Sequence, residues 1–420
     1  MDGHVLLLVL AAALLHATWN SIVKGGSNKL FESSMNALGG GLGALLILPF
    51  LPAPAPESWG LLALSCCFHL TYYICISQAY DKVDLSMGYT IMRGCAPMIT
   101  ALALLLVENG HDVTLWSHRP EKAEELRRTR ENPMLKGVTL PEAMHFTADL
   151  ACVADCGAVL MVTPSYAVRE TAAKLRAFLR PGTVVISASK GIEKSTSLRL
   201  SQVIEEELEG KCPVVVLSGP SHAEEVGRHI PTGVVPAAAR RADAELVQDL
   251  FMNKRFRVYT SDDRIGTEIC AALKNVIALC AGCTDGMGCG DNTKALLMTR
   301  GLAEMARLGV ALGGRKDTFT GLAGVGDLIV TCTSMHSRNR RCGILIGQGT
   351  PAAEAVKEIG AVVEGYYAAA TARALAQKAG VEMPITEAAY QVLYGGRDTR
   401  AVIKELMTRA RKHELEDSWV

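Results

Sequence analysis

Two lysine residues, Lys190 and Lys274, are the groups in this sequence best suited to proton transfer. Hydride delivery to a ketone leaves an alkoxide, and a lysine can protonate it only where burial or a nearby like charge lowers the lysine pKa toward neutrality. Lys190 follows a strand-like run over 183–187, and ligands sit at the carboxyl edge of parallel sheets. Without further context, either lysine is more often an ordinary solvated cation.

Three consecutive residues, Ser337-Arg338-Asn339, could bind an anionic group such as a phosphate. A guanidinium presents several N–H donors in one plane, which match the oxygens of a phosphate. The hydroxyl and the amide on either side of it can add hydrogen bonds. Arg338 is the predicted anchor. Arg340 and Arg341, which follow directly, are expected to be solvated.

Three other residues are suited to supporting such a site. Asp327 lies ten positions before Ser337 and could bind a substrate hydroxyl or orient a lysine. Gly219 allows close backbone approach, and Ser221 offers a hydroxyl.

The elements that must position these groups follow an alternating pattern. Short apolar runs predict strands over 112–116, 158–162, 183–187, 213–217 and 255–259. Amphipathic stretches between them predict helices over 121–131, 166–179 and 197–208. This alternation implies a mostly parallel, doubly wound, Rossmann-like α/β sheet, placed at 108–262. A separate all-α domain is predicted at 263–420, with helices over 266–281, 292–312, 363–378, 385–393 and 399–412.

The end of the strand predicted over 112–116 bears on the choice of a dinucleotide cofactor. Enzymes selective for NAD usually place a carboxylate there for the ribose hydroxyls. This chain has Ser117-His118-Arg119, which better suits a 2′-phosphate. NADPH is therefore the preferred cofactor, with NADH as the alternative, unless His118 and Arg119 only face solvent.

The beginning of the chain has a different composition. Only nine charged residues occur among the first 107, and the stretches 5–23, 33–56 and 58–80 carry none. About 20 apolar residues cross a bilayer, so three transmembrane helices are predicted, with 85–107, interrupted by Arg93, as a fourth candidate. We expect residues 1–107 to contact a lipid bilayer and to make the protein membrane-associated, with the enzyme domain in the cytoplasm; a wholly cytoplasmic protein is the alternative.

Charge and cysteine content exclude other classes of partner. The chain has 43 basic and 43 acidic residues, a balance that argues against a nucleic-acid surface. Thirteen scattered cysteines favour a reducing compartment. Cys280, Cys283 and Cys289 have zinc-like spacing, but no fourth ligand is nearby, and we predict no metal site.

Seven motifs in order resemble the bacterial NAD(P)-dependent glycerol-3-phosphate dehydrogenase family over about residues 100–415. They are Ser189-Lys190-Gly191-Ile192-Glu193, Ser218 to Val226, Ala272-Leu273-Lys274-Asn275-Val276, Gly324 to Leu328, Ser337 to Arg341, Val363-Glu364-Gly365 and Met383 to Glu387. The resemblance implies reduction of dihydroxyacetone phosphate to sn-glycerol 3-phosphate, a phospholipid precursor, and is compatible with a homodimer.

The same resemblance implies roles for single residues. Lys274 is the implied proton donor in reduction and acceptor in oxidation. The implied substrate contacts are Lys190, Gly219, Ser221, Lys274, Asp327, Ser337, Arg338 and Asn339. The implied cofactor contacts are His118, Arg119, Lys190, Ala223, Arg338, Val362 and Glu364. Glu364 could instead be only a favourable charge in the first turn of a helix.

One segment departs from the family pattern. Gly94-Cys95-Ala96-Pro97-Met98-Ile99 stands where a G-x-G-x-x-G turn belongs, and the missing glycines should weaken contact with the pyrophosphate. Residues 88–107 therefore have two interpretations. In one, they form a degenerate first strand, turn and helix, and the sheet domain starts near 88. In the other, they form a membrane helix, and the sheet lacks its first strand.

The segment around Leu14 to Lys24 resembles the first half of EamA-like drug/metabolite transporters, over about residues 1–107. Such transporters normally have two repeated halves, and no second half follows. We hypothesise a gene fusion or a chimera. The alternative function is a membrane transport or anchoring protein with an inactive dehydrogenase domain.

Overall fold

The computed structural model describes residues 89–92, 97–133, 135–411 and 414, and its strands form one eight-stranded sheet. The strand order is β3-β2-β1-β4-β5-β6-β7-β8. Strands β1 to β6 run parallel, β7 is antiparallel to β6, and β8 is parallel to β7. The bounds are β1 Tyr89–Met92, β2 Val113–Trp116, β3 Met144–Thr147, β4 Ala158–Met161, β5 Val184–Ser187, β6 Val214–Ser218, β7 Thr232–Ala237 and β8 Phe256–Val258.

The five strands predicted from apolar runs are confirmed as β2, β4, β5, β6 and β8. Two strands were not predicted. In β7, Gly233 and Pro236 are residues that argue against a strand in sequence, although Pro236 lies in the antiparallel pair with Leu217. In β3, only four residues alternate, and they follow a long irregular stretch.

Helices cover both faces of the sheet, as the buried strands require. Strands β4, β5 and β6 are buried at every position, which is typical of parallel strands with helices on both sides. Leu160 and Ile186 pack toward α4, α8 and α9, whereas Val159 and Val185 pack toward α6 and α7. The bounds are α4 Pro97–Glu108, α5 Pro120–Thr129, η3 Leu150–Asp155, η4 Ser165–Ala167, α6 Val168–Leu175, α7 Leu200–Glu207, α8 Ala223–Val226 and α9 Arg241–Phe251.

Residues 89–108 belong to this sheet domain. Strand β1 pairs with β2 on one edge and with β4 on the other, so it lies in the sheet interior. In α4, every residue from Ile99 to Leu106 is buried, and the apolar ones belong to the same core as Val226 of α8 and Phe251 of α9. The membrane helix considered over 85–107 is therefore wrong for the described part of that stretch, because protein covers its apolar residues. The first strand is present, and the sheet domain begins before 108.

The three predicted spans over 5–23, 33–56 and 58–80 lie outside the described residues, as does the turn at 93–96. Among the described residues, one helix, α10 Arg264–Gly286, is long and apolar enough to cross a membrane. In this structure, 89% of its apolar window is buried inside the protein. It is the central helix of the second domain, where its burial is explained by the helices around it.

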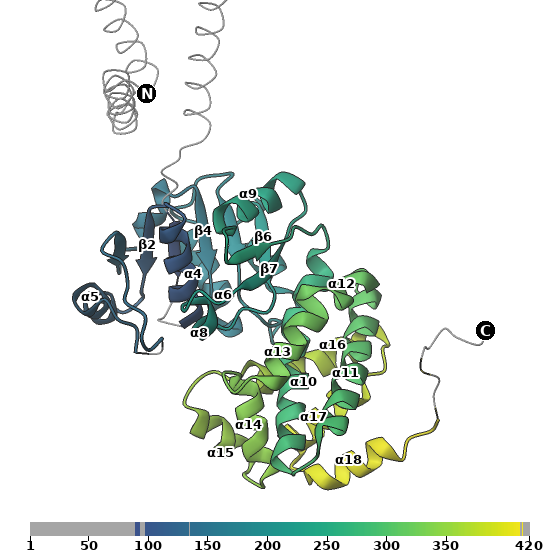
Figure 1. Cartoon of the computed structure of the whole chain (residues 1–420). Helices are drawn as coiled ribbons and strands as arrows, with labels where there is room; N and C mark the ends of the chain where they lie inside the picture. The colour runs from purple at the N-terminus through teal and green to yellow at the C-terminus, as the bar shows by residue number, and fades with distance from the viewer. Residues whose placement is uncertain (1–88, 93–96, 134, 412–413, 415–420) are drawn as a thin grey trace, which may run out of the picture. The chain divides into compact units, whose positions relative to one another are not determined.

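The second domain contains only helices among its described residues (Figure 1). The predicted helices are confirmed as α10, α11, α16, α17 and α18, and shorter helices that were not predicted connect them. Their bounds are α11 Asp291–Ala311, α12 Lys316–Thr320, a π-helical turn η5 Leu322–Gly326, α13 Asp327–Thr333, α14 Arg338–Gly347, α15 Ala352–Ile359, α16 Glu364–Ala379, α17 Pro384–Gly395 and α18 Thr399–Met407.

Helices α10 and α14 approach so closely that their backbones touch. A Cβ atom on Gly282 would lie 2.0 Å from the Arg340 carbonyl oxygen, and one on Gly343 would lie 2.0 Å from the Leu279 carbonyl oxygen. Only glycine fits at these positions. The contact fixes the start of α14, which carries Arg338, relative to α10, which carries Lys274.

Candidate functional site

A cavity of about 560 Å³ lies where the carboxyl ends of β4 and β5 face the helical domain. Twelve of the thirteen predicted site residues line it: His118, Arg119, Lys190, Ser221, Ala223, Lys274, Asp327, Ser337, Arg338, Asn339, Val362 and Glu364. The carboxyl edge of a doubly wound sheet is where such folds bind ligands.

Gly219 is the predicted residue that does not line this cavity. Its φ is +138°, and a Cβ atom there would lie 2.9 Å from the Val234 Cα atom. The close backbone approach expected at Gly219 is therefore an approach to strand β7.

Asp327 lies between the two lysines. Its Oδ1 accepts a hydrogen bond from Lys274 Nζ at 2.5 Å, and its Oδ2 accepts one from Lys190 Nζ at 3.1 Å. The Lys274 and Asp327 side chains are 5% and 1% exposed, whereas Lys190 is 21% exposed. A buried carboxylate thus holds two ammonium groups from different domains at one point.

The environment lowers the pKa of Lys274 to about 7. Burial is the main cause because it disfavours the charged ammonium, and the Lys190 charge lowers the pKa further, while Asp327 opposes both. Burial alone would raise the pKa of Asp327, but the charges of Lys190 and Lys274 lower it. Asp327 therefore stays ionised while Lys274 can exchange a proton near neutral pH.

Thr331 is a site residue that the sequence analysis missed. Lys274 Nζ donates a 2.8 Å hydrogen bond to its hydroxyl, which in turn donates to the Asp327 carbonyl oxygen at 2.5 Å. Thr331 and Asp327 are four residues apart in α13 and so share a helix face. The four-residue spacing from Asp327 was the feature of the sequence that could have identified Thr331.

Arg338 begins α14 and faces the same cavity. Burial lowers its pKa, and Glu364 and Glu224 oppose that shift. Among the described residues, no hydrogen bond or ion pair occupies the guanidinium, so its donor fork is available to a ligand. The start of a helix also favours an anion through its free backbone N–H groups.

The neighbours of Arg338 hold the start of α14 in place. The Ser337 hydroxyl accepts a hydrogen bond from the Arg340 backbone N–H at 3.2 Å. The Asn339 amide donates to Asn275 Oδ1 at 2.9 Å and accepts from the Gly365 N–H at 2.8 Å. Both predicted side chains line the cavity, yet Ser337 already caps the start of α14 and Asn339 already joins α14 to α10 and α16.

Arg340 is not solvated as predicted. Its guanidinium forms 2.8 Å ion-pair contacts with Asp285, and its side chain is 13% exposed. The reason is the close packing of α10 on α14, which brings Asp285 within reach of Arg340.

At the other end of the cavity, His118 and Arg119 follow strand β2. Both side chains are exposed, and Arg119 Nε donates to His118 Nε2 at 3.4 Å. Met98, at the start of α4, lies along the same cavity. The Arg119 guanidinium and the His118 ring are therefore placed at the end of the second strand, beside the helix that follows β1.

Glu364 connects the two domains across this cavity. Its Oε2 accepts a 2.8 Å hydrogen bond from the Ser165 hydroxyl of η4, and its Oε1 accepts one from the Ser165 backbone N–H at 3.3 Å. Burial raises its pKa, whereas Ser165 and Arg338 lower it. Ser165 was not predicted, because its role depends on a contact 199 positions away in the sequence.

Comparison with known proteins decides the family. Residues 99–244 match the family described as NAD-dependent glycerol-3-phosphate dehydrogenase N-terminus, and residues 263–404 match its C-terminus. The chain belongs to the NAD-dependent glycerol-3-phosphate dehydrogenase family. One match falls on the sheet domain and the other on the helical domain.

Individual relatives agree with this family. A glycerol-3-phosphate dehydrogenase [NAD(P)+] from Moorella thermoacetica is 57% identical over 319 residues, 76% of this chain and 95% of that protein. One from Desulfitobacterium hafniense is 52% identical over 332 residues, 79% of this chain and 94% of that protein. The crystal structure of glycerol-3-phosphate dehydrogenase from Coxiella burnetii has a TM-score of 0.74 and 37% identity, covering 77% of this chain and 100% of that chain.

The family match on the sheet domain begins at residue 99. The transporter resemblance over about 1–107 stays a prediction. Among the described residues, no group of three or more His, Cys, Asp or Glu side chains is placed to hold a metal ion.

Proposed function

We propose that this chain reduces dihydroxyacetone phosphate to sn-glycerol 3-phosphate, with Lys274 as the proton donor and NADPH as the preferred cofactor. The observation that carries the proposal is the Lys190–Asp327–Lys274 arrangement in a cavity shared by both domains. Relatives that are 52% and 57% identical over 79% and 76% of this chain are named glycerol-3-phosphate dehydrogenase [NAD(P)+], which supports the proposal.

The residues present fit a dinucleotide. The cavity follows the carboxyl ends of β4 and β5, and β1 lies beside β4 where the strand order reverses, which is the usual dinucleotide position. The reduced nicotinamide supplies a hydride to the substrate carbonyl carbon when bound. The carbonyl π-electron pair then moves to oxygen, and the Lys274 ammonium donates a proton to that oxygen, which gives the hydroxyl of the product.

Lys190 and Asp327 support this proton transfer. Ionised Asp327 fixes the Lys274 ammonium and holds Lys190 beside it. The Lys190 charge helps keep the Lys274 pKa near neutrality, where the lysine can both donate a proton in reduction and accept one in oxidation.

Arg338 binds the substrate phosphate in this proposal. Its free donor fork matches a phosphate, and the start of α14 adds backbone N–H groups. Ser221 lines the same space and can add a hydroxyl contact. The implied cofactor contacts of Ala223 and Val362 rest on the resemblance together with their places in the cavity wall.

The cofactor preference rests on the end of β2. His118 and Arg119 are exposed to the cavity, and neither is the carboxylate that NAD-selective enzymes place there. The charge of Arg119 and the hydrogen-bonding groups of both side chains suit the 2′-phosphate of NADPH. Pro97 at the start of α4 has no N–H to offer, so the altered turn is expected to weaken the pyrophosphate contact.

The test is NADPH oxidation by the purified full-length chain with dihydroxyacetone phosphate. We expect activity with NADPH, a lower kcat/KM with NADH, and loss of activity in Lys274→Ala but not in the exposed control Lys404→Ala. Full activity in Lys274→Ala would contradict the proton-donor role. Activity found only after a G-x-G-x-x-G turn replaces residues 94–99 would support the inactive-dehydrogenase alternative.

A further inference from the structure

Lys190 reaches Asp327 from a loop. Strand β5 ends at Ser187 and α7 begins at Leu200, so residues 188–199 carry Lys190 without regular secondary structure around it. The Lys190 Nζ atom contacts Asp327 at 3.1 Å across the domain boundary. A long side chain on a loop keeps such a contact only if the loop itself is held.

Glu193, three residues after Lys190, closes this loop on itself. Its backbone N–H donates to the Leu198 carbonyl oxygen at 3.0 Å, and its carbonyl oxygen accepts from the Ser197 N–H at 2.9 Å. The Thr196 hydroxyl donates to Glu193 Oε2 at 2.5 Å and accepts from the Leu198 N–H at 3.2 Å. The end of the loop is thus a compact turn organised around one carboxylate.

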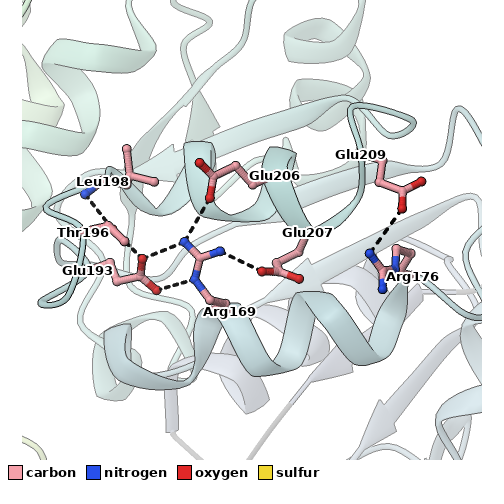
Figure 2. Close-up of polar contacts among 8 residues, drawn as sticks. All are labelled: Arg169, Arg176, Glu193, Thr196, Leu198, Glu206, Glu207 and Glu209. Carbon is pink, nitrogen blue, oxygen red and sulfur yellow. Dashed lines mark hydrogen bonds and ion pairs between the residues drawn. The ribbon is translucent and has the colours of Figure 1, made fainter.

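Arg169 of α6 holds this carboxylate with two parallel hydrogen bonds. Arg169 Nε donates to Glu193 Oε1 at 2.8 Å, and Arg169 Nη2 donates to Oε2 at 2.7 Å (Figure 2). The Glu193 side chain is only 12% exposed. A two-bond arginine–carboxylate pair whose carboxylate is largely covered is more strongly fixed than an ordinary surface ion pair.

The same guanidinium is itself fixed by α7. Arg169 Nη1 donates to Glu207 at 2.7 Å, and Nη2 donates to Glu206 at 3.0 Å. Figure 2 shows Arg169 between these carboxylates and Glu193. Arg169 therefore connects two helices of the sheet domain to the turn next to Lys190.

We propose that Arg169 is a positioning residue for the reaction, which holds Glu193 and thereby fixes the Lys190 loop at the distance from Asp327 that the site requires. This inference rests on the proposed function of Lys190 and Lys274. Arg169 lies outside the cavity lining and touches neither lysine, so its effect on the reaction is indirect.

The consequence can be measured at Lys274. Because the Lys190 charge lowers the pKa of Lys274, a displaced Lys190 should let that pKa rise. Reduction needs the Lys274 ammonium, so kcat/KM falls as pH rises through this pKa, and the falling limb should move to higher pH. If a variant only contained less folded protein, kcat/KM would be lower at every pH, and the pH at which it falls would not change.

Arg176 supplies a matched control. It follows α6 directly and forms an ion pair with Glu209 beyond the end of α7 at 3.2 Å, as Figure 2 shows, but it does not contact the Lys190 loop. Arg169→Ala and Arg176→Ala therefore each remove one arginine from the same region of the protein surface.

The experiment compares kcat/KM for dihydroxyacetone phosphate against pH in full-length wild type, Arg169→Ala, Arg176→Ala and Glu193→Gln. In Arg169→Ala we expect a loss of about 10- to 100-fold in kcat/KM and a limb about one pH unit higher. Glu193→Gln should shift the limb in the same direction by less, and Arg176→Ala should match wild type.

If the wild type is active and kcat/KM of folded Arg169→Ala falls at the same pH as that of wild type, the inference is wrong. The proposed function would still stand. If Arg169→Ala does not fold, an unshifted limb in Glu193→Gln has the same meaning. A wild type without dihydroxyacetone phosphate reduction would overturn the proposed function, and this inference with it.

Discussion

Replacement of Asp327 by asparagine is the sharpest test of the charge arrangement at the site. The change keeps the shape of the side chain and removes the negative charge that lies 2.5 Å from Lys274 Nζ and 3.1 Å from Lys190 Nζ. The two ammonium groups then share a buried space without a counter-ion. The neutral form of Lys274 becomes more favourable, so its pKa should fall further.

The size of the shift follows from Coulomb's law. Two unit charges about 4 Å apart interact by about 4 kcal/mol at an effective dielectric constant of about 20. At about 1.4 kcal/mol for each pKa unit, this corresponds to about three units. Relaxation of the lysines and entry of water reduce it, and we expect the Lys274 pKa to fall by about one to three units.

The assay measures kcat/KM against pH in both reaction directions. Reduction needs the Lys274 ammonium, so its falling limb should move from about 7 to lower pH in Asp327→Asn. Oxidation needs the neutral amine, so its rising limb should move in the same direction. The control is Asp291→Asn, because the Asp291 side chain is fully exposed. A folded Asp327→Asn variant with both limbs unmoved would refute the electrostatic argument.

Two other predictions concern pH and backbone geometry. Glu304 is buried and accepts hydrogen bonds from the Ile385 N–H at 2.6 Å and the Thr386 N–H at 3.2 Å; burial raises its pKa from 4.5 to about 7. The folded protein therefore holds this proton more tightly than the unfolded chain, so the stabilisation is present below about pH 4.5 and is lost as pH rises through about 7. Melting temperatures from pH 5 to 8 should fall less in Glu304→Gln than in wild type, and equal slopes would exclude Glu304 as the cause. Gly191 has φ +148°, and a Cβ atom there would lie 2.7 Å from Ser165 Cβ. Gly191→Ala should therefore displace the Lys190 loop and lower the free energy of unfolding by about 1–3 kcal/mol. It should also lower kcat/KM. Denaturant unfolding and steady-state kinetics test this, with Gly182→Ala, which shares a positive φ but has open space around it, as the control for backbone strain.

Periodicity and motifs predicted much of the fold. Buried strands such as β4 and β5 are continuous apolar runs, and α10 is long and apolar, so each appears directly in the sequence. Strand β7 does not, because Gly233, which pairs with β8, and Pro236, which pairs with β6, are residue types that argue against a strand. Helix α4 was ambiguous because an apolar helix buried by α8 and α9 has the composition of a membrane helix.

The site was predicted from residue types, and its internal contacts were not. Motifs indicated Lys190, Lys274, Asp327 and Arg338, and the structure places all four around one cavity. That Asp327 holds both lysines depends on the packing of α13 against α10, which no local pattern encodes. Arg169 carried no signal, because its three glutamates come from two separate segments of the chain.

Strand β1 gives the sheet its continuity. Thr90 pairs with Thr114 on one edge and with Val159 on the other, so four residues join β2 and β3 to the strands that carry the cavity. Main-chain amides and carbonyls make these connections, whatever side chains stand there. A recombination that exchanges the sequence before Pro97 must therefore supply a short extended segment that can pair on both edges. One with proline at its centre would lack a ladder N–H there and would weaken the link between β2, which leads into His118 and Arg119, and the rest of the sheet.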